Sequence, residues 1–269
     1  MGEPRVVGAR ISRLNICKLL LSQKEFKLNT TKQNELQVGD EIAAGNAGWT
    51  FGGEVAKTFD SHVSKSVPFY EEGHSLICGV SDFFVKDNSI VYEIGCSTGM
   101  LSKRLASHNI SKNARFIGID CESAMVDQAR SSSSMKNLEF VQADILEYEF
   151  EKSDFITSYY TIQFIHPSLR QALINRIFEN LNWGGGFLFF EKVRACDARF
   201  QDMMTALYTD FKLEQGYSAG EIVGKTKSLK GVLEPFSTQG NLDMLKRAGF
   251  EDVTSVMKYV SFEGFLAIK

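Results

Sequence analysis

The stretch Val91-Tyr92-Glu93-Ile94-Gly95-Cys96-Ser97-Thr98-Gly99-Met100 decides the fold. Its apolar residues predict a buried strand, and the two glycines predict a turn that opens into a helix. Glycine adopts positive φ without a Cβ clash and lets a backbone approach a ligand closely. Nucleotide-binding folds of several chemistries share this order of strand, glycine turn and helix, so the motif predicts a ligand site without naming the ligand.

Downstream of this turn, strand and helix patterns alternate regularly. We expect strands over 90–94, 115–120, 138–142, 155–159, 187–190, 253–260 and 262–268, with a turn over 182–186. The clearest helix covers 167–181, with apolar residues at four-residue spacing and proline in its first turn. Such alternation predicts a mainly parallel sheet with helices on both faces. The short connection before the last strand makes that strand antiparallel, so we expect an α/β, Rossmann-like fold with a seven-stranded sheet.

Three segments do not follow this alternation. Residues 1–47 form an expected N-terminal extension, basic and amphipathic over 10–28 and a polar linker over 28–46, before a domain over 48–269. Helices are expected from Val55 to Val63 and again after Pro68, which disfavours helix at the preceding residue. Residues 193–237 contain a helix with a Met and aromatic face, ending near Gly216, and then a basic, glycine-containing run over 224–230. We interpret 193–237 as a lid insertion over the ligand cleft.

Composition narrows the class of protein. The net charge of −3 and the pI near 5.9 leave no global basic field, which argues against a nucleic-acid partner. The five cysteines stand far apart without a C-x-x-C pair. This pattern indicates a reduced, cytoplasmic protein with no disulfide framework and no metal site. No apolar run approaches membrane-spanning length, so we expect no membrane partner.

Polar and glycine residues follow the expected strands, at the edge where ligands bind such sheets. Asp120 follows Gly99 by 21 residues, and at this spacing its carboxylate can accept hydrogen bonds from both hydroxyls of a ribose. The same spacing also fits a dinucleotide (NAD) site. A dinucleotide needs a small glycine turn under its pyrophosphate, whereas Ser97 replaces the middle glycine here. Glu93, an acid just before the turn, is typical of S-adenosylmethionine (SAM) sites, where it meets the ammonium or a ribose. The sequence therefore favours SAM over NAD as the cofactor.

The other candidate site residues follow the later strands. Asp144 would bind the adenine amino group, with the Ile145 backbone beside it and Cys121 next to the ribose acid. Tyr159, His166 and Glu191 are the candidate catalytic residues, since each lies near the expected acceptor position. A helix cap is the alternative for His166. The cluster Lys225, Lys227 and Lys230 binds an anionic substrate in one interpretation and is solvated in the other.

Several runs make the chain resemble one family, the bacterial carboxy-SAM synthases. They are Trp49-Thr50-Phe51, Ser66-Val67-Pro68-Phe69-Tyr70, Gly95-Cys96-Ser97, Thr161-Ile162-Gln163-Phe164, Gln171-Ala172-Leu173, Glu191-Lys192, Asp210-Phe211-Lys212, Gly216-Tyr217-Ser218 and Lys246-Arg247-Ala248-Gly249-Phe250. The family has the class I methyltransferase fold and belongs to the tRNA wobble-uridine pathway. The resemblance covers about residues 49–269.

The resemblance implies a set of ligand contacts. The family's cofactor residues match Tyr70, Gly95-Cys96-Ser97, Asp120 and Asp144-Ile145. Its members make carboxy-SAM from SAM and prephenate, as homodimers in which an arginine contributed across the interface holds the new carboxylate. Counted without gaps, that arginine falls on Thr226, and a family asparagine falls on Tyr159. Threonine carries no charge, and lysine does not reproduce the bidentate fork of arginine.

Three functions follow from these observations. The first is a SAM-dependent methyltransferase that acts on a small-molecule acceptor, as a homodimer. The second is a true carboxy-SAM synthase whose carboxylate clamp is rebuilt from Lys225 and Lys227. The third is a non-catalytic module that binds SAM or its product S-adenosylhomocysteine (SAH). A tRNA methyltransferase is disfavoured by the acidic pI.

Overall fold

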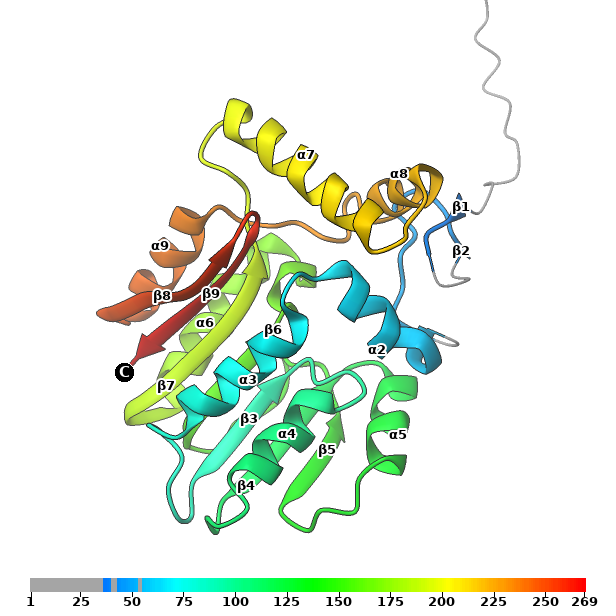
Figure 1. Ribbon diagram of the computed structural model, residues 1–269. Coiled ribbons are helices and arrows are strands. Elements are labelled where there is room, and N and C mark those ends of the chain that lie inside the picture. Colours follow the sequence, from blue (N-terminus) through cyan, green and yellow to red (C-terminus); the bar gives the residue numbers. More distant parts are fainter. Residues whose placement is uncertain (1–35, 40–42, 53–54) are drawn as a thin grey trace, which may run out of the picture. The chain divides into compact units, whose positions relative to one another are not determined.

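The computed structural model describes residues 36–39, 43–52 and 55–269, which belong to one compact unit over 35–269. The expected amphipathic segment over 10–28 lies outside the described residues. Within them the chain forms a seven-stranded sheet with helices on both faces and a helical insertion at one end (Figure 1).

The sheet has the expected topology. Its strands are β3 (Ile90–Ile94), β4 (Arg115–Asp120), β5 (Leu138–Gln142), β6 (Ser153–Tyr159), β7 (Leu181–Lys192), β8 (Asp252–Tyr259) and β9 (Phe262–Ile268). They lie in the order β5-β4-β3-β6-β7-β9-β8, and β9 alone runs against the other six. The chain leaves β3 for one side of the sheet and later enters β6 beside it, so the carboxyl ends of these two strands form the switch point where ligands bind.

Helices cover the two faces of the sheet. The helices α3 (Tyr70–Ser81), α4 (Met100–His108) and α5 (Ser123–Ser131) lie on one face, and α6 (Pro167–Asn180) and α9 (Thr238–Ala248) lie on the other (Figure 1). Alternate residues of each strand point to opposite faces. In β7, Phe187 and Phe189 pack with the α6 and α9 side, whereas Leu188 and Phe190 pack with α3 and α4. This alternation decides which strand-end side chains reach the ligand cleft.

Local sequence explains where the helices start and stop. Pro167 occupies the first turn of α6, and the His166 side chain accepts a hydrogen bond from the Ser168 backbone N–H at 3.3 Å, which caps the helix. Helix α9 starts at a Ser237 cap and stops at Gly249, whose φ of 115° favours glycine. The bounds of α6 match the predicted helix over 167–181 to within one residue.

The insertion after β7 contains two helices and has a closed stem. These helices are α7 (Ala198–Glu214) and α8 (Ala219–Ser228), and with α2 (Val55–Ser66) they lie beyond the carboxyl ends of the strands (Figure 1). At the stem, the Arg194 backbone N–H donates to the Phe236 carbonyl at 2.9 Å, and Arg194 forms a parallel bridge with Ser237. The two ends of the insertion therefore lie side by side.

In three segments the structure differs from the sequence predictions or adds to them. The expected polar linker contains two short strands, β1 (Leu36–Gln37) and β2 (Ala43–Ala44), next to α8. The basic run over 224–230 is mostly helical, because α8 starts with a capping box between Ser218 and Glu221 and extends to Ser228. The expected turn over 182–186 lies within β7, at a register shift opposite the amino end of β6 between Ser153 and Phe155.

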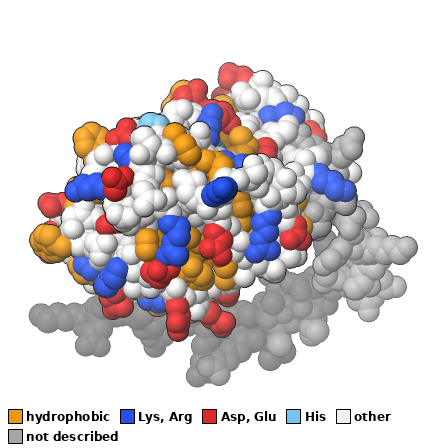
Figure 2. Space-filling model, turned by 90° about the horizontal axis from the view of Figure 1, so that it is seen from below, with side chains coloured by type: hydrophobic (Ala, Val, Ile, Leu, Met, Phe, Trp, Pro, Cys, Tyr) orange, Lys and Arg blue, Asp and Glu red, His pale blue; other side chains and the backbone are white. Residues whose placement is uncertain are grey.

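The surface at the amino ends of the strands carries interspersed charges. Figure 2 shows acidic and basic side chains mixed over this face, without a field of one sign. Two of its ion pairs join Lys112 to Asp82 at 3.3 Å and Arg115 to Glu151. In the described part of the chain, no helix is long and apolar enough to cross a membrane.

Candidate functional site

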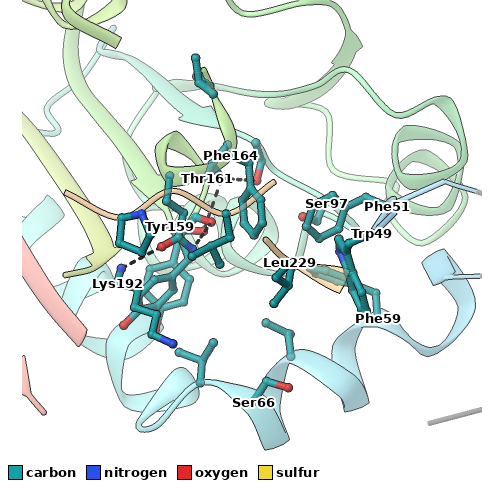
Figure 3. A pocket seen from close by; sticks show the side chains of 18 of the residues that line it. Trp49, Phe51, Phe59, Ser66, Ser97, Tyr159, Thr161, Phe164, Lys192 and Leu229 are labelled. Carbon is teal, nitrogen blue, oxygen red and sulfur yellow. Dashed lines mark hydrogen bonds between the residues drawn. The ribbon is translucent and has the colours of Figure 1, made fainter. Parts of the chain in front are cut away.

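A cavity of about 710 Å³ lies at the carboxyl ends of β3, β4 and β6. That volume is within the ~300–1,000 Å³ typical of small-molecule sites. Its walls come from the glycine turn, the strand ends, α2 and the insertion (Figure 3). The insertion therefore contributes residues to the wall of this cavity.

The glycine turn is shaped by close backbone contacts. Gly95 has a φ of 72°, and a Cβ there would lie 2.2 Å from the Thr161 side chain. The backbone N–H groups of Gly95 and Cys96 both donate to the Ile119 carbonyl, at 2.8 and 3.0 Å. Ser97 also has positive φ, 48°, which places its N–H within 2.9 Å of an Asp120 carboxylate oxygen. The turn is thus tied to the end of the neighbouring strand, and Gly95, Cys96 and Ser97 line the cavity.

Glu93 is a buried acid at the floor of the cavity. Only 5% of its surface is exposed, and its carboxylate accepts a hydrogen bond from the Ser102 hydroxyl on α4. Burial raises the pKa of Glu93 to about 8, against the lowering effect of Ser102. Such a group gains from a hydrogen-bonding or cationic ligand in the cavity, because a buried carboxylate needs a partner.

The acids after β4 and β5 line the next part of the cavity. The carboxylate oxygens of Asp120 accept from the backbone N–H of Ser97 and of Glu122, both at 2.9 Å. Burial raises the pKa of Asp120, and these backbone donors oppose that shift. Asp144 is exposed and accepts from the Leu146 N–H at 2.9 Å. Cys121 and Ile145 also line the cavity beside these acids.

Gly99 does not line the cavity. It lies at the start of α4 with a φ of 75°, and a Cβ there would lie 2.4 Å from the Phe140 ring. Its role in the structure is close packing of α4 against the sheet.

Tyr159 and Tyr70 form the wall near α3. The Tyr159 hydroxyl donates to the Tyr70 carbonyl at 2.8 Å, and their ring centroids are 5.1 Å apart. Burial raises the pKa of Tyr159 well above its ordinary value. The hydroxyl is therefore a fixed donor, which positions α3 against β6 and does not act as a base.

The other two catalytic candidates lie in different surroundings. His166 is exposed at the cavity margin, where its Nδ1 atom lies 2.8 Å from the Ser168 hydroxyl and caps α6. Glu191 does not line the cavity. It points to the α6 side of β7, where burial raises its pKa to about 8 and the nearby Arg170 charge and the Ile162 and Gln163 backbone oppose that shift. The expected position near an acceptor is taken by the next residue, Lys192.

Several buried cations face the cavity from the lid side. Lys192 and Lys212 both approach the Tyr208 ring, with their Nζ atoms 4.1 and 4.7 Å from its centroid. Lys225 is held between α2 and α8, where its Nζ atom lies 2.7 Å from the Ser66 hydroxyl and 2.5 Å from His62 Nε2. Of the expected lysine cluster, Lys225 and Lys230 line the cavity and Lys227 does not.

Aromatic rings form the wall of the cavity opposite Lys192. Figure 3 shows Trp49, Phe51 and Phe59 near Ser97, with Tyr159 and Lys192 across the cavity. Phe51 packs edge to face on Phe164, with centroids 4.8 Å apart. The cavity therefore offers carboxylates near the turn and two places where a lysine meets a ring, Lys225 at 5.4 Å from the Trp49 centroid and the pair Lys192 and Lys212 at Tyr208.

Sequence reasoning missed Lys192 and Lys212 as cavity residues with a specific role. Strand alternation could have found Lys192, because Phe190 and Lys192 must share a face and Glu191 must take the other. Tyr160 has a φ of 59°, which no sequence pattern signals. The position of Lys212 at the cavity depends on how α7 packs over the sheet, and this tertiary packing cannot be predicted from the local sequence.

The donor set fits SAM. A buried acid lies before the turn, and two further acids lie at the ends of the next two strands, all facing one cavity. Asp120 keeps lone pairs beyond its two backbone bonds, so it can accept hydroxyl groups. Among the described residues, no group of three or more His, Cys, Asp or Glu side chains could hold a metal ion.

Comparison with known proteins gives one consistent family. A methyltransferase domain model matches residues 91–185. A carboxy-S-adenosyl-L-methionine synthase from Staphylococcus epidermidis is 38% identical over 222 residues, which cover 82% of this chain and 97% of that protein. One of the same name from Campylobacter lari is 38% identical over 221 residues, covering 81% and 94%.

Solved structures support the fold. The SAM-dependent methyltransferase SibL matches with a TM-score of 0.53 at 15% identity, over 78% of this chain and 55% of that one. The YcgJ protein of Bacillus subtilis matches with a TM-score of 0.52 at 15% identity, over 71% and 72%. At these identities the likeness concerns the fold alone.

Proposed function

Since the chain belongs to the carboxy-S-adenosyl-L-methionine synthase family of class I SAM-dependent methyltransferases, we propose that it transfers a methyl group from SAM to a small-molecule acceptor. SAM is its cofactor and supplies, when bound, a methyl group on a positively charged sulfur. One observation carries the proposal. The cavity that contains the SAM-type turn continues into a ring- and lysine-lined space beneath the lid, which suits an acceptor of small size.

The proposed roles follow from the geometry. Glu93, Asp120 and Asp144 bind the polar groups of the cofactor, with Gly95, Cys96, Ser97, Cys121 and Ile145 in backbone or packing contact and Tyr70 and Tyr159 at the amino-acid end. Lid residues enclose the acceptor and exclude water. Holding two reactants in line supplies much of the rate in such a site. The protonated hydroxyl of Tyr160 orients ligands, and of the three catalytic candidates Tyr159, His166 and Glu191 only His166 is exposed to solvent.

The loss of the family's clamp favours a methyl acceptor. Thr226, at the position of the implied arginine, is exposed at the cavity margin and carries no charge. The test is incubation with SAM and a panel of small carboxylic acids, phenols and amines, with mass spectrometry of both products. SAH and an acceptor heavier by one methylene should appear in equal amounts.

A second function, carboxy-SAM synthesis, has a specific observation in its favour. The curated relatives carry that name, and Lys225 lies buried at the cavity wall, where it could replace the clamp. Incubation with SAM and prephenate separates the two functions. A carboxylated SAM product would contradict methyl transfer, and Lys225→Met should then abolish that product.

A non-catalytic module remains the third proposal, with tight SAH binding and no product from any acceptor or from prephenate. We also propose a cytoplasmic homodimer, with a domain over 48–269 and a lid over about 193–237. Light scattering after gel filtration tests the dimer directly. A monomer at micromolar concentration would contradict it.

A further inference from the structure

Two lysines that have no carboxylate partner in the described part of the chain approach one ring of the cavity wall. Lys192 lies at the end of β7, on the side where Leu188 and Phe190 pack, and Lys212 lies one turn after Tyr208 on α7. Their Nζ atoms contact the Tyr208 ring, and Lys192 also lies 5.8 Å from the Phe262 centroid. Two separate elements thus bring two cations to one place.

The surroundings of these lysines are apolar. Lys212 is only 5% exposed, and the rings of Tyr208 and Phe262 pack at 5.1 Å between centroids. Within the described residues, neither ammonium group hydrogen-bonds or ion-pairs with an acid. Contact with a ring face offsets only part of the cost of burying an ammonium. Two such cations beside a cavity form a site that lacks its anion.

A third donor lies in the same cluster of rings. The Tyr160 hydroxyl is buried without a hydrogen-bond partner among the described residues, and Tyr160 lines the cavity. Its ring packs 5.8 Å from Phe262. The left-handed backbone at Tyr160 costs on the order of 1 kcal/mol, and such strain concentrates at ligand sites.

We propose that Lys192 and Lys212 bind a carboxylate of the acceptor, whose apolar body packs on the rings of Tyr160, Tyr208 and Phe262. The proposal rests on the proposed function, because it assigns the acceptor's chemical class at the same cavity. Ammonium groups form strong, charge-assisted hydrogen bonds with carboxylates. The rings favour a flat or aliphatic body over a strongly hydrated one.

The probe is a matched pair of ligands, 3-phenylpropionate and 3-phenylpropionamide, titrated calorimetrically into the full chain saturated with SAH. The two differ in charge and share their apolar part. We expect the acid to bind at least tenfold more tightly than the amide. Lys192→Met and Lys212→Met should each weaken the acid at least tenfold and leave the amide within twofold. Lys246→Met, exposed on α9 and outside the cavity, is the control and should change neither.

SAH affinity, measured separately for every variant, distinguishes failure of this proposal from failure of the proposed function. Normal SAH binding shows that a variant is folded. Equal affinities for acid and amide, unchanged acid binding in both lysine variants, or no acid binding by the natural chain would each overturn the carboxylate site. Loss of SAH binding by the natural chain would overturn the proposed function instead.

Proton uptake provides an independent readout. Burial and the neighbouring charges of Lys212, Arg194 and Lys230 lower the pKa of Lys192 to about 7, and burial lowers that of Lys212 to about 8. An anion favours the charged forms, so binding at pH 8 should take up protons. Calorimetry in two buffers of different ionisation enthalpy measures this uptake. Acid affinity should fall as pH rises from 6.5 to 9, and Lys192→Met should reduce both effects. Buffer-independent heats would contradict the assignment.

Discussion

Glu93 holds a carboxyl group that is almost fully buried, and this has a consequence for stability. Its native pKa of about 8 exceeds the ordinary value of 4.5, so the native state binds more protons than the unfolded state between those pH values. The free energy of unfolding therefore decreases as pH rises from about 5 to 8. Each pKa unit corresponds to about 1.4 kcal/mol.

Glu93→Gln removes this proton and keeps the Ser102 hydrogen bond, because the amide oxygen can still accept. As pH rises from 5 to 8, we expect the natural chain to lose a few kcal/mol of unfolding free energy that the variant keeps. Urea unfolding at four pH values measures it. Parallel pH curves for the two proteins would contradict the buried, neutral Glu93.

At the scale of single residues, the sequence predicted which acids share one cavity. Glu93, Asp120 and Asp144 all line it, because each lies at or near the end of a strand and strand ends in a parallel sheet must meet. Their role toward the cofactor stays a prediction. The opposite side of the cavity was predicted less well. Glu191 and Lys192 are neighbours in sequence, and one residue of register decides which of them enters the cavity.

At the scale of elements, helix α3 contains two glycines, and we expect alanine to have opposite effects on stability at the two positions. A Cβ on Gly73 would lie 2.0 Å from the Tyr159 hydroxyl, whereas a Cβ on Gly79 meets nothing within 4 Å. We expect Gly73→Ala to destabilise the chain by about 1–3 kcal/mol through overpacking. Gly79→Ala should stabilise it by about 0.5–1 kcal/mol, because alanine favours helix.

Chemical unfolding of both alanine variants, with SAH binding as a second measurement, checks this pair. Gly73→Ala should also weaken SAH binding, since Tyr159 lines the cavity. Equal stabilities for the two variants would show that the contact between Gly73 and Tyr159 relaxes without cost.

The return segment of the lid is held by one buried arginine. The Arg170 guanidinium, 2% exposed, donates to the carbonyls of Ile165, Glu234 and Gln163 at 2.8, 2.7 and 2.9 Å. Arg170→Met should cost about 3 kcal/mol of stability, because it leaves buried carbonyls without donors. Arg199→Met, on the exposed side of α7, is the matched control and should stay within about 0.5 kcal/mol. Thermal and urea unfolding measure both, and equal losses would contradict the role of Arg170.

The elements that could not be predicted from the sequence share one physical reason, which is that their residues show no clear periodic pattern. The strands β1 and β2 contain two residues each, too few to show a period. Helix α8 includes two glycines and two lysines, which hide its pattern, although the capping box at Ser218 and Glu221 was readable. Long apolar strands were predictable because burial alone specifies them, as the matching bounds of β3, β4 and β5 show.

At the scale of the whole molecule, the charge distribution bears on partners. The net charge is −3, and Figure 2 shows no field of one sign on the face at the amino ends of the strands. RNA binding requires a basic footprint and falls steeply with salt. We expect no saturable binding of bulk tRNA below about 100 μM protein at physiological salt, as measured by fluorescence anisotropy. Low-micromolar, salt-sensitive binding would contradict the small-molecule proposal.

The stem of the lid has a consequence for how such enzymes diversify. Arg194 and Ser237 pair with each other, so the intervening segment enters and leaves the domain at one point. Segments with adjacent ends can be exchanged without disturbing the host domain. A lineage could therefore acquire a new acceptor by replacing one continuous stretch of gene, while the cofactor half is inherited intact. The same junctions mark where a chimaera between relatives of different specificity should be cut.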